Sequence, residues 1–439
     1  MWLAAGLDNG VRAGFPRSGA FLLAFALDAK MSLRGFLKSG HTPTLFSAFL
    51  YFDLSFMVWV LLGPLGVAIS KSLHLDAGQK GLMVATPLLA GAVLRVVFGV
   101  LVDHIGPKRA GIIGQLTVLA GLGLAWFLGV HSYSQVLILA IVLGVAGASF
   151  AVALPLASRW YPPEQQGLAL GIAGAGNSGT ALAGLFAPSL AKAFGWTNVI
   201  GLATIPLAGV FLVYLFLAKD APNQPPAKKP SEYLAVLKQP DCWWLMLLYS
   251  VTFGGFSGLA SSLTIYFNGE YHLDPVIAGF FTAGCVFAGS IWRPVGGALA
   301  DRLGGINTLT FVYGVAAAAL AAASFHLAGP WVALAVLLVA MMALGAGNGA
   351  VFQLAPQRFR KEIGVITGVV GAMGGFGGFY LASTLGFAKQ LTGSYQPGFL
   401  GFAALALVAQ FVLLGLKGRW RAIWPTLHAG VGDAAPIRV

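Results

Sequence analysis

Charge is the scarcest property of this chain. Of its 439 residues, 9% are Asp, Glu, Lys or Arg, whereas 58% are hydrophobic. A composition so poor in charge excludes an ordinary soluble globular domain and is typical of a polytopic helical membrane protein. The alternating ten-residue segments of a membrane β-barrel are also missing from the sequence. We therefore expect an all-α membrane protein.

Patterns that mark reactive or metal-binding sites are missing as well. Cys242 and Cys285 are the two cysteines, and both lie in long apolar segments without metal-ligand spacing. We interpret them as small apolar core residues. The sequence contains no phosphate-binding P-loop and no Ser/His/Asp arrangement, which argues against an ATP-driven pump and a membrane-embedded enzyme. We expect no cofactor and no metal.

Long apolar segments follow one another along the chain, each near or above the ~20 residues that a helix needs to span the hydrocarbon core. They predict twelve transmembrane helices. The segments cover residues 43–70, 79–103, 109–130, 135–158, 166–194, 197–218, 241–268, 276–300, 306–328, 330–355, 363–392 and 396–417.

The net charge of +12 marks membrane topology rather than a nucleic-acid partner. Of the 26 Lys and Arg residues, 20 lie in the N-terminal segment, the loops after even-numbered segments and the C-terminal tail. Two lie inside apolar segments, and the four on the opposite side are Lys71, Lys80, Lys192 and Lys389. Basic loops mark the cytoplasmic side, so we expect a multi-pass protein of the cytoplasmic (inner) membrane with both termini in the cytoplasm.

A polar stretch rich in Pro and Lys predicts a cytoplasmic linker between six helices and six. Residues 1–30 superficially resemble a signal peptide, but no small-x-small cleavage site follows cleanly. We therefore expect a disordered extension, or a start assigned upstream of the true one at Met31. The expected boundaries are 1–42 for a cytoplasmic N-terminal segment, 43–218 for the first half, 219–240 for the linker, 241–417 for the second half and 418–439 for a cytoplasmic tail.

The two halves repeat each other. From Arg95 the chain reads RVVFGVLVDHIG, and 198 residues later, from Arg293, it reads RPVGGALADRLG. GASFAVALP (147–155) matches GAVFQLAP (349–356), and GLALGIAGAGNSG (167–179) matches GVITGVVGAMGGFGG (364–378) with an offset near 197. Two pseudo-symmetric six-helix halves, with a binding site between them at mid-membrane, are typical of secondary transporters.

The two arginines lie deep inside apolar segments. A charged side chain at mid-bilayer costs from about 3 to more than 10 kcal/mol, so such residues usually act on a substrate or ion. Arg95 lies eight residues before Asp103 at the helix end, about 12 Å in depth and too far for snorkelling. Pairing with a buried acid is the alternative, but Asp53 is the only carboxylate well inside a span and cannot neutralise both. We therefore expect Arg95 and Arg293 to bind an anion, for which the flat guanidinium fork is well suited.

The fifth and eleventh expected helices are dense in glycine. Small residues let membrane helices approach closely, and glycine also weakens a helix that must bend or slide. Asn177 lies among them, and its amide could hydrogen-bond an anion or serve interhelical packing. The glycines concerned are Gly171, Gly174, Gly176 and Gly179 in the fifth helix and Gly371, Gly374, Gly375 and Gly377 in the eleventh.

The loop after the second helix reads GVLVDHIGPKR (99–109), and a weaker copy after the eighth reads GGALADRLGG (296–305). Both resemble the loop signature of the major facilitator superfamily. Its physical content is a helix-ending glycine, an aspartate near a neighbouring helix terminus and surface cations. We expect a cytoplasmic gate network rather than a substrate site, formed by Gly99, Asp103, Gly106, Arg109, Asp301 and Arg302.

The glycine-rich helices make the resemblance more specific. GAGNSG, GAMGGFGG and the paired arginines are similar to the nitrate/nitrite porter family of that superfamily. YFDLSFMVWVLLGPLG (51–66) and GAGNGAVFQLAPQRF (345–359) fit the same family, so the resemblance covers residues 43–417. It implies that Arg95 and Arg293 coordinate nitrate.

The resemblance also implies that aromatic rings sandwich the ion. Carried over by motif, this cage falls on Phe150, Tyr249 and Phe253, with Asn177 beside it. Nitrate is flat, delocalised and weakly hydrated, so a dry slot between rings with two guanidinium forks suits it. Compact, strongly hydrated phosphate or sulfate would not fit such a slot.

Asp53 leaves the energy coupling open. It lies about 15 Å into the first helix, where it could carry a proton with the anion. The alternatives are a permanent salt bridge or a hydrogen bond to Ser55 or a backbone turn. We lean to proton-coupled nitrate import by alternating access, and a nitrate/nitrite exchanger is the alternative because an empty doubly positive site resists reorientation.

Two further classes fit less well. An organic-anion antiporter shares the need for buried arginines. A membrane anion sensor would need an output domain, and a linker of about twenty residues leaves no room for one. The expected partners are nitrate, nitrite, possible coupling protons and the lipid bilayer, without nucleic acid, and we expect a monomer.

Overall fold

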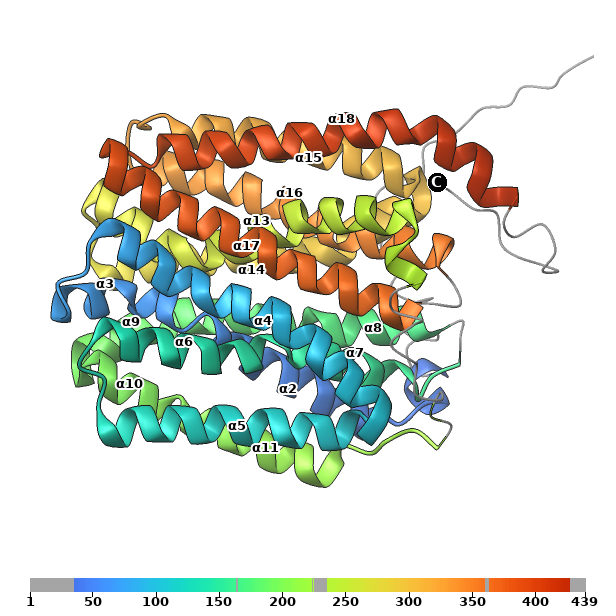
Figure 1. The fold of residues 1–439 in the computed structure, drawn as a ribbon, viewed down its shortest axis with the longest axis horizontal. Coiled ribbons are helices and arrows are strands. Elements are labelled where there is room, and N and C mark those ends of the chain that lie inside the picture. Colours follow the sequence, from blue (N-terminus) through green and yellow to red (C-terminus); the bar gives the residue numbers. More distant parts are fainter. Residues whose placement is uncertain (1–34, 163–164, 223, 225–234, 360–362, 427–439) are drawn as a thin grey trace, which may run out of the picture.

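The computed structural model describes residues 35–162, 165–222, 224, 235–359 and 363–426 (Figure 1). Every element of regular structure in these ranges is helical. The expected extension before Met31, half of the expected linker and the end of the expected tail lie outside the described residues.

The elements follow the expected order of apolar segments. The first half contains α2 (Thr42–Trp59), α3 (Leu62–Ser72), α4 (Ala77–Ile105), α5 (Pro107–Leu128), α6 (Tyr133–Gly147), α7 (Ser149–Ser158), α8 (Gln166–Gly174), the 3-10 turn η2 (Ala175–Ser178), α9 (Gly179–Phe194), α10 (Trp196–Leu202) and α11 (Thr204–Leu217). The second half contains α13 (Pro240–Tyr271), α14 (Pro275–Leu303), α15 (Gly305–Ser324), α16 (Pro330–Arg358), α17 (Ile363–Thr392) and α18 (Gln396–Thr426).

Within the described ranges, 11 stretches of helix are long and apolar enough to cross a membrane. The remaining expected span, residues 166–194, consists of α8, η2 and α9. The four-residue 3-10 turn divides it into parts that are each too short to count as a span. Glycine weakens a helix interior, but the equally glycine-rich α17 is continuous, so glycine permits this break without by itself causing it. Counted as one broken helix, this segment completes the expected twelve-helix fold.

The two halves lie side by side, with α2–α11 below and α13–α18 above in Figure 1. We call the end of the bundle where α2 begins and α18 ends the linker face, and the opposite end the far face. The halves meet along two equivalent helix pairs, α4 with α17 and α9 with α14. This seam positions the site described below.

The seam is tightest toward the far face. A Cβ on Gly81 of α4 would lie 2.7 Å from Cα of Gly386 in α17, and one on Gly184 of α9 would lie 3.0 Å from the carbonyl oxygen of Gly279 in α14. Glycine at such positions lets membrane helices approach this closely. Toward the linker face, α8 packs on α2 and α7 of its own half. The two halves are therefore closed against each other at the far face.

Helix ends at the two faces are set by local sequence. At the far face, Oδ1 of Asp76 accepts a hydrogen bond from N–H of Gln79 at 2.8 Å, which caps α4. At the linker face, Gly106 and Gly304 end α4 and α14 with φ angles of 85° and 88°. This backbone conformation favours glycine. The same residue in the same conformation at both positions agrees with the internal repeat.

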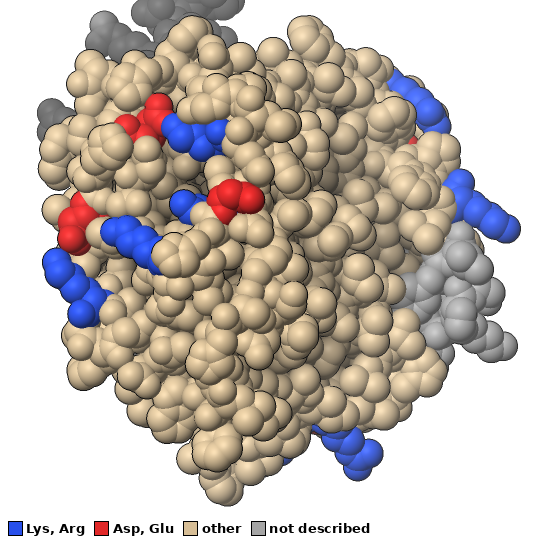
Figure 2. Space-filling model, turned by 60° about the vertical axis from the view of Figure 1, so that its left-hand side comes forward, with Lys and Arg blue, Asp and Glu red and all other residues tan. Residues whose placement is uncertain are grey.

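Figure 2 brings the far face forward and shows a mostly uncharged surface with a few charged side chains, some of opposite sign side by side. One pair joins the halves there, since Nζ of Lys192 in α9 lies 3.3 Å from Oδ2 of Asp274 before α14. Both side chains are well exposed, so this pair contributes at most about 1 kcal/mol. The glycine contacts, not this ion pair, close the far face.

Helix α18 continues to Thr426, beyond the expected boundary at 417. Trp420 and Trp424 are fully buried, and their rings stack at 4.6 Å. Nε1 of Trp420 donates a hydrogen bond to Oδ1 of Asp241 at the start of α13, at 2.9 Å. These contacts hold the extra turns of α18 against the second half.

Gly377 provides a test of the close packing. A Cβ on Gly377 of α17 would overlap the carbonyl group of Ser250 in α13, whereas a Cβ on Gly368 of the same helix would meet no atom within 4 Å. Gly377→Ala should lower the free energy of unfolding by about 1–3 kcal/mol, the usual cost of overpacking. Gly368→Ala should leave it unchanged or raise it slightly. Thermal unfolding in detergent measures both, and equal midpoints would contradict the packing.

Candidate substrate-binding site

Arg95 lies on α4 and is fully buried. Its Nε donates a hydrogen bond to the carbonyl oxygen of Gly147 at 2.9 Å, and its Nη1 donates to that of Gly371 at 2.6 Å. Gly147 ends α6 in the first half, whereas Gly371 belongs to α17 in the second. One guanidinium group therefore bridges the two halves. Its buried Nη2 has no hydrogen-bond partner in the described part of the chain.

Aromatic rings surround the guanidinium group of Arg95. Its Cζ lies 5.0 Å from the ring centroid of Trp59, 5.1 Å from Phe253, 5.3 Å from Phe150 and 5.8 Å from Phe56. Such contacts stabilise a desolvated cation by about 2 kcal/mol or more. The family resemblance implied Phe150 and Phe253, whereas the two rings from α2 were not expected.

Arg293 lies on α14 and is partly exposed. Its Cζ and Nη2 are each 3.8 Å from the position of a Cβ on Gly174 in α8, and its Cζ lies 5.9 Å from the ring centroid of Phe352. Gly174 and Gly371 correspond to each other at the repeat offset of the fifth and eleventh helices. Each arginine therefore reaches the equivalent glycine of the opposite half.

Tyr249 and Phe253 lie one turn apart on α13, and their rings stack at 5.2 Å with an interplanar angle of 11°. A Cβ on Gly374 of α17 would lie 2.6 Å from Phe253 and 2.9 Å from Tyr249, so the missing side chain lets α17 pack on both rings. Phe352 of α16 meets Tyr249 edge-on at 4.9 Å. The buried Tyr249 side chain lies within electrostatic reach of both arginines. The three expected aromatic residues thus gather with the arginines.

No acid among the described residues forms a salt bridge with either arginine. The ionisable groups that act on Arg95 are Tyr249 and Arg293. Asp53 is buried on α2, but its Oδ1 accepts a hydrogen bond from Oγ of Ser178 at 2.7 Å. It forms no salt bridge among the described residues. Two guanidinium charges in a low-dielectric site repel each other, and a bound anion would relieve that repulsion.

Asn177 lies in η2, where the fifth helix is broken, and is 1% exposed. Its Oδ1 has no hydrogen-bond partner among the described residues. It follows Gly174 by three residues, so it lies about one turn from the contact with Arg293. A buried amide oxygen that lacks a donor costs about 1–3 kcal/mol, and an oxyanion, which only accepts, does not supply that donor.

Of the remaining expected packing glycines, four make close helix contacts and one does not. A Cβ on Gly176 or Gly179 would clash with α2, one on Gly375 would lie 2.7 Å from a carbonyl oxygen of α4, and one on Gly377 would overlap α13. These four make close helix contacts. Gly171 differs from the expectation, because it is exposed and its Cβ would meet no atom within 4 Å. It lies on α8, whose last residue, Gly174, meets Arg293 of the second half.

At the loop motif of the first half, one of the residues expected in the gate network, Asp103, forms an ion pair. Oδ1 of Asp103 lies 3.2 Å from Nη2 of Arg159 at the end of α7. Next to it, N–H of Lys108 donates to Oδ1 of Asp220 at 2.9 Å, which ties the start of α5 to the linker. Arg109 is exposed, and a Cβ on Gly99 would meet no atom within 4 Å. The cation partner of Asp103, Arg159, was not expected from the loop motif.

The second half differs at its copy of the loop motif. Asp301 and Arg302 are both exposed, and neither forms an ion pair within the ranges that the structure describes. Arg358, which ends α16 as Arg159 ends the fourth span, instead places its Nε 2.6 Å from Oδ2 of Asp241. In the second half, the arginine that ends the helix therefore pairs with an aspartate outside the loop motif.

The sequence analysis missed four residues that contact Arg95 or Arg293. Phe352 had a signal, because it aligns with Phe150 in the match between GASF and GAVF. No sequence signal marked the other three residues. Phe56 and Trp59 lie outside the repeated motifs, and Gly147 acts through its backbone carbonyl group. Their role follows only from the packing of α2 and α6 on α4.

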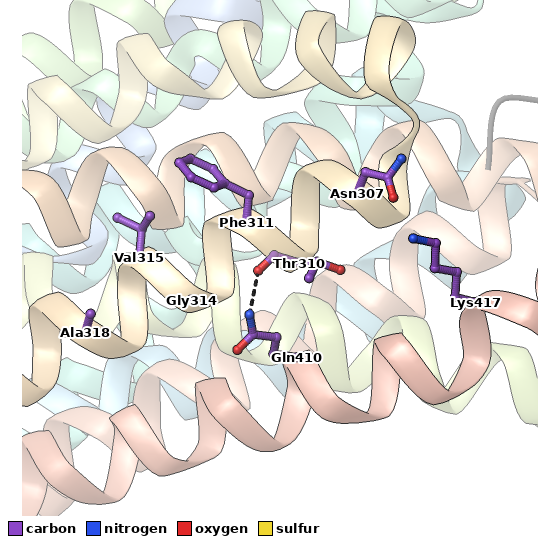
Figure 3. A pocket seen from close by; sticks show the side chains of 8 residues that line it. All are labelled: Asn307, Thr310, Phe311, Gly314, Val315, Ala318, Gln410 and Lys417. Atoms are coloured by element: carbon purple, nitrogen blue, oxygen red, sulfur yellow. Dashed lines mark hydrogen bonds between the residues drawn. The ribbon is translucent and has the colours of Figure 1, made fainter.

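A second concave region is a groove of about 550 Å³ between α15 and α18 (Figure 3). Its only charged lining residue is Lys417, and Nε2 of Gln410 donates a hydrogen bond to the carbonyl oxygen of Thr310 at 2.9 Å. The groove is open and mostly apolar, and it contains neither of the paired arginines. We therefore place the anion site at the seam and not in this groove.

Comparison with known proteins supports the family resemblance. A protein of Bacillus subtilis named nitrite extrusion protein is 33% identical over 361 residues, which cover 82% of this chain and 90% of that protein. A protein of Mycobacterium tuberculosis named probable nitrate/nitrite transporter NarK2 is 34% identical over 364 residues, covering 81% and 91%. A protein of Staphylococcus carnosus named probable nitrate transporter NarT is 31% identical over 373 residues, covering 84% and 94%.

The fold is also shared with a solved structure. A bacterial homolog of the human lysosomal transporter Spinster, in an inward-facing and occupied conformation, aligns with a TM-score of 0.65. The alignment covers 85% of this chain and 96% of that one at 16% identity. A sequence model described as Major Facilitator Superfamily matches residues 45–382. With twelve helices in two repeated halves, this chain belongs to the Major Facilitator Superfamily.

Proposed function

We propose that this protein is a secondary transporter that moves nitrate, and also nitrite, across the cytoplasmic membrane by alternating access. The observation that carries the proposal is the pair of arginines that reach across between the halves and form no salt bridge with an acid in the described part of the chain. The names of its relatives, which refer to nitrate or nitrite, support the choice of ion. The protein is a transporter and not an enzyme.

The geometry suits a flat oxyanion. Nη2 of Arg95 and Nη1 of Arg293 are both buried, neither makes a hydrogen bond of normal geometry in the described chain, and the Tyr249 hydroxyl lies close to Arg293. Each can donate to one oxygen of the ion. The rings of Phe150 and Phe253 flank the Arg95 guanidinium and leave the site apolar above and below. A tetrahedral, strongly hydrated anion such as phosphate would lose more hydration than two donors and aromatic faces return.

The charge distribution supports a cytoplasmic linker face. Lys108, Arg109, Arg159 and Arg302 lie at that end of the described helices, as expected for the inner side of a membrane. Because the halves are closed at the far face, we propose that this conformation exchanges its substrate with the cytoplasm. Opening of the glycine contacts at Gly81 and Gly184 would then expose the site to the outside.

For energy coupling, we propose that Asp53 carries a proton during nitrate import. Asp53 is buried, lacks a salt bridge in the described chain and bonds to Ser178 beside the break in the fifth helix. Rearrangement of that break would therefore change its surroundings. Nitrate/nitrite exchange is the second candidate, and the unbalanced charge of Arg95 and Arg293 favours it, because an empty doubly positive site is costly to reorient.

The guanidinium geometry is testable by replacement with lysine. Lysine presents its three N–H donors from a single atom, so it cannot reproduce the spread of donors with which the guanidinium group of arginine reaches backbone carbonyls and an anion at once. Arg95→Lys and Arg293→Lys should each reduce nitrate uptake into proteoliposomes by roughly 10- to 100-fold, the loss expected for a charge-assisted hydrogen bond. Arg419→Lys on the exposed end of α18 is the control and should match the parent protein.

The same vesicles separate the competing functions. Nitrite should compete with nitrate uptake, while phosphate and oxalate should not. Competition by oxalate or phosphate instead would indicate an organic-anion or phosphate antiporter. Nitrate binding without any flux would leave an anion sensor as the better account.

Asp53→Asn separates proton coupling from exchange. The variant keeps the shape of the side chain and its hydrogen bond to Ser178, but it cannot release a proton. It should abolish nitrate accumulation driven by a pH gradient and preserve exchange of external nitrate for internal nitrite. Radiotracer or fluorescent-probe flux in proteoliposomes measures both. Uphill uptake equal to that of the parent protein would rule out Asp53 as the proton carrier.

A further inference from the structure

Asn348 is a buried amide without a structural role that its surroundings explain. It lies on α16 and is 1% exposed. Neither its Nδ2 nor its Oδ1 forms a hydrogen bond within the described residues. Buried polar groups in folded proteins are nearly always hydrogen-bonded, so an amide with both atoms unpartnered calls for an explanation, which its position in the fold can supply.

The helix places Asn348 next to the arginine site. It precedes Phe352 by four residues, so the two side chains lie one turn apart and about 40° around the helix axis. Phe352 contacts Tyr249 at 4.9 Å and Arg293 at 5.9 Å. On the other side of Asn348 around the axis, Gly347 packs on Thr252 of α13. Asn348 therefore lies on the α16 surface between α13 and the site.

The internal repeat shows why the second half needs an amide from this helix. Asn177 of the first half corresponds to Gly374 in the second, at the offset of 197 that relates the fifth and eleventh helices. Gly374 must remain free of a side chain, because a Cβ there would lie 2.6 Å from Phe253. The second half can place an amide near the site only from another helix, and Asn348 does so from α16.

The unpartnered polar atoms of the site form one set. Nη2 of Arg95, Nη1 of Arg293, the hydroxyl of Tyr249 and the amide of Asn348 are all buried without a hydrogen bond of normal geometry in the described chain. All four groups can donate a hydrogen bond. A small oxyanion accepts hydrogen bonds in several directions and could satisfy them together.

We propose that Asn348 donates a hydrogen bond from Nδ2 to the transported oxyanion and favours nitrate over nitrite. This inference rests on the proposed nitrate and nitrite transport. The two arginine nitrogens can each serve one oxygen, which suffices for the two oxygens of nitrite. The third oxygen of nitrate needs a further donor, and Asn348 and Tyr249 supply it from the second half.

Asn348→Leu tests the proposal, with Gln115→Leu as the matched control. Gln115 is another buried amide whose side-chain atoms lack partners in the described chain, but it lies on α5, which packs only within the first half. Asn348→Leu should raise KM for nitrate about tenfold, equivalent to about 1.4 kcal/mol, and raise KM for nitrite at most about threefold. Gln115→Leu should change neither KM. Uptake into proteoliposomes measures all four values.

Nitrate binding to the purified protein distinguishes the loss of a hydrogen bond from a folding defect. Asn348→Asp keeps the side-chain shape but replaces the donor with an acid, so nitrate should no longer raise the midpoint of thermal unfolding. If the parent protein transports nitrate and both Asn348 variants behave like Gln115→Leu, this inference is wrong and the proposed function stands. If the parent protein transports neither nitrate nor nitrite, both this inference and the proposed function are wrong.

Discussion

The arrangement of the site depends on the bridge that Arg95 makes between the two halves. Its guanidinium group donates to Gly147 in its own half and to Gly371 in the other. Rocking that separates α4 from α17 would break the second bond and leave a buried cation with fewer acceptors. A bound oxyanion replaces the lost acceptor, so it can stabilise states in which the halves have moved. In the transport cycle that we propose, substrate binding and conformational change are thereby linked through one side chain.

The glycines make this linkage possible. Gly374 lets α17 lie on the rings of Tyr249 and Phe253, and Gly174 lets the Arg293 guanidinium approach α8. The price is a fifth helix that breaks into α8, η2 and α9 at the level of Asn177. The break separates α9, which packs along α14, from α8, which meets α14 where Gly174 approaches Arg293. The weak point of the helix therefore coincides with the binding site, where movement between the halves is needed.

Much of the fold could be predicted from sequence, because hydrocarbon imposes simple rules on length and charge. Twelve apolar segments, the repeat and the two unbalanced arginines are visible without coordinates. The contacts of Trp59 and Gly147 with Arg95 are not visible in the sequence, because they depend on how α2 and α6 pack on α4. The ion pair of Asp103 with Arg159 likewise joins residues that no motif connects. Sequence patterns identified the charged groups, whereas the partners of those groups could be identified only from the packing of the helices.

The central claim is that one oxyanion lies between Arg95 and Arg293. Isothermal titration of the purified protein with nitrate tests it most directly, through the number of ions bound per chain. The account predicts one nitrate per chain, and no measurable binding when either arginine is replaced by glutamine. Two nitrate ions per chain, or unchanged affinity in either single variant, would contradict a shared site.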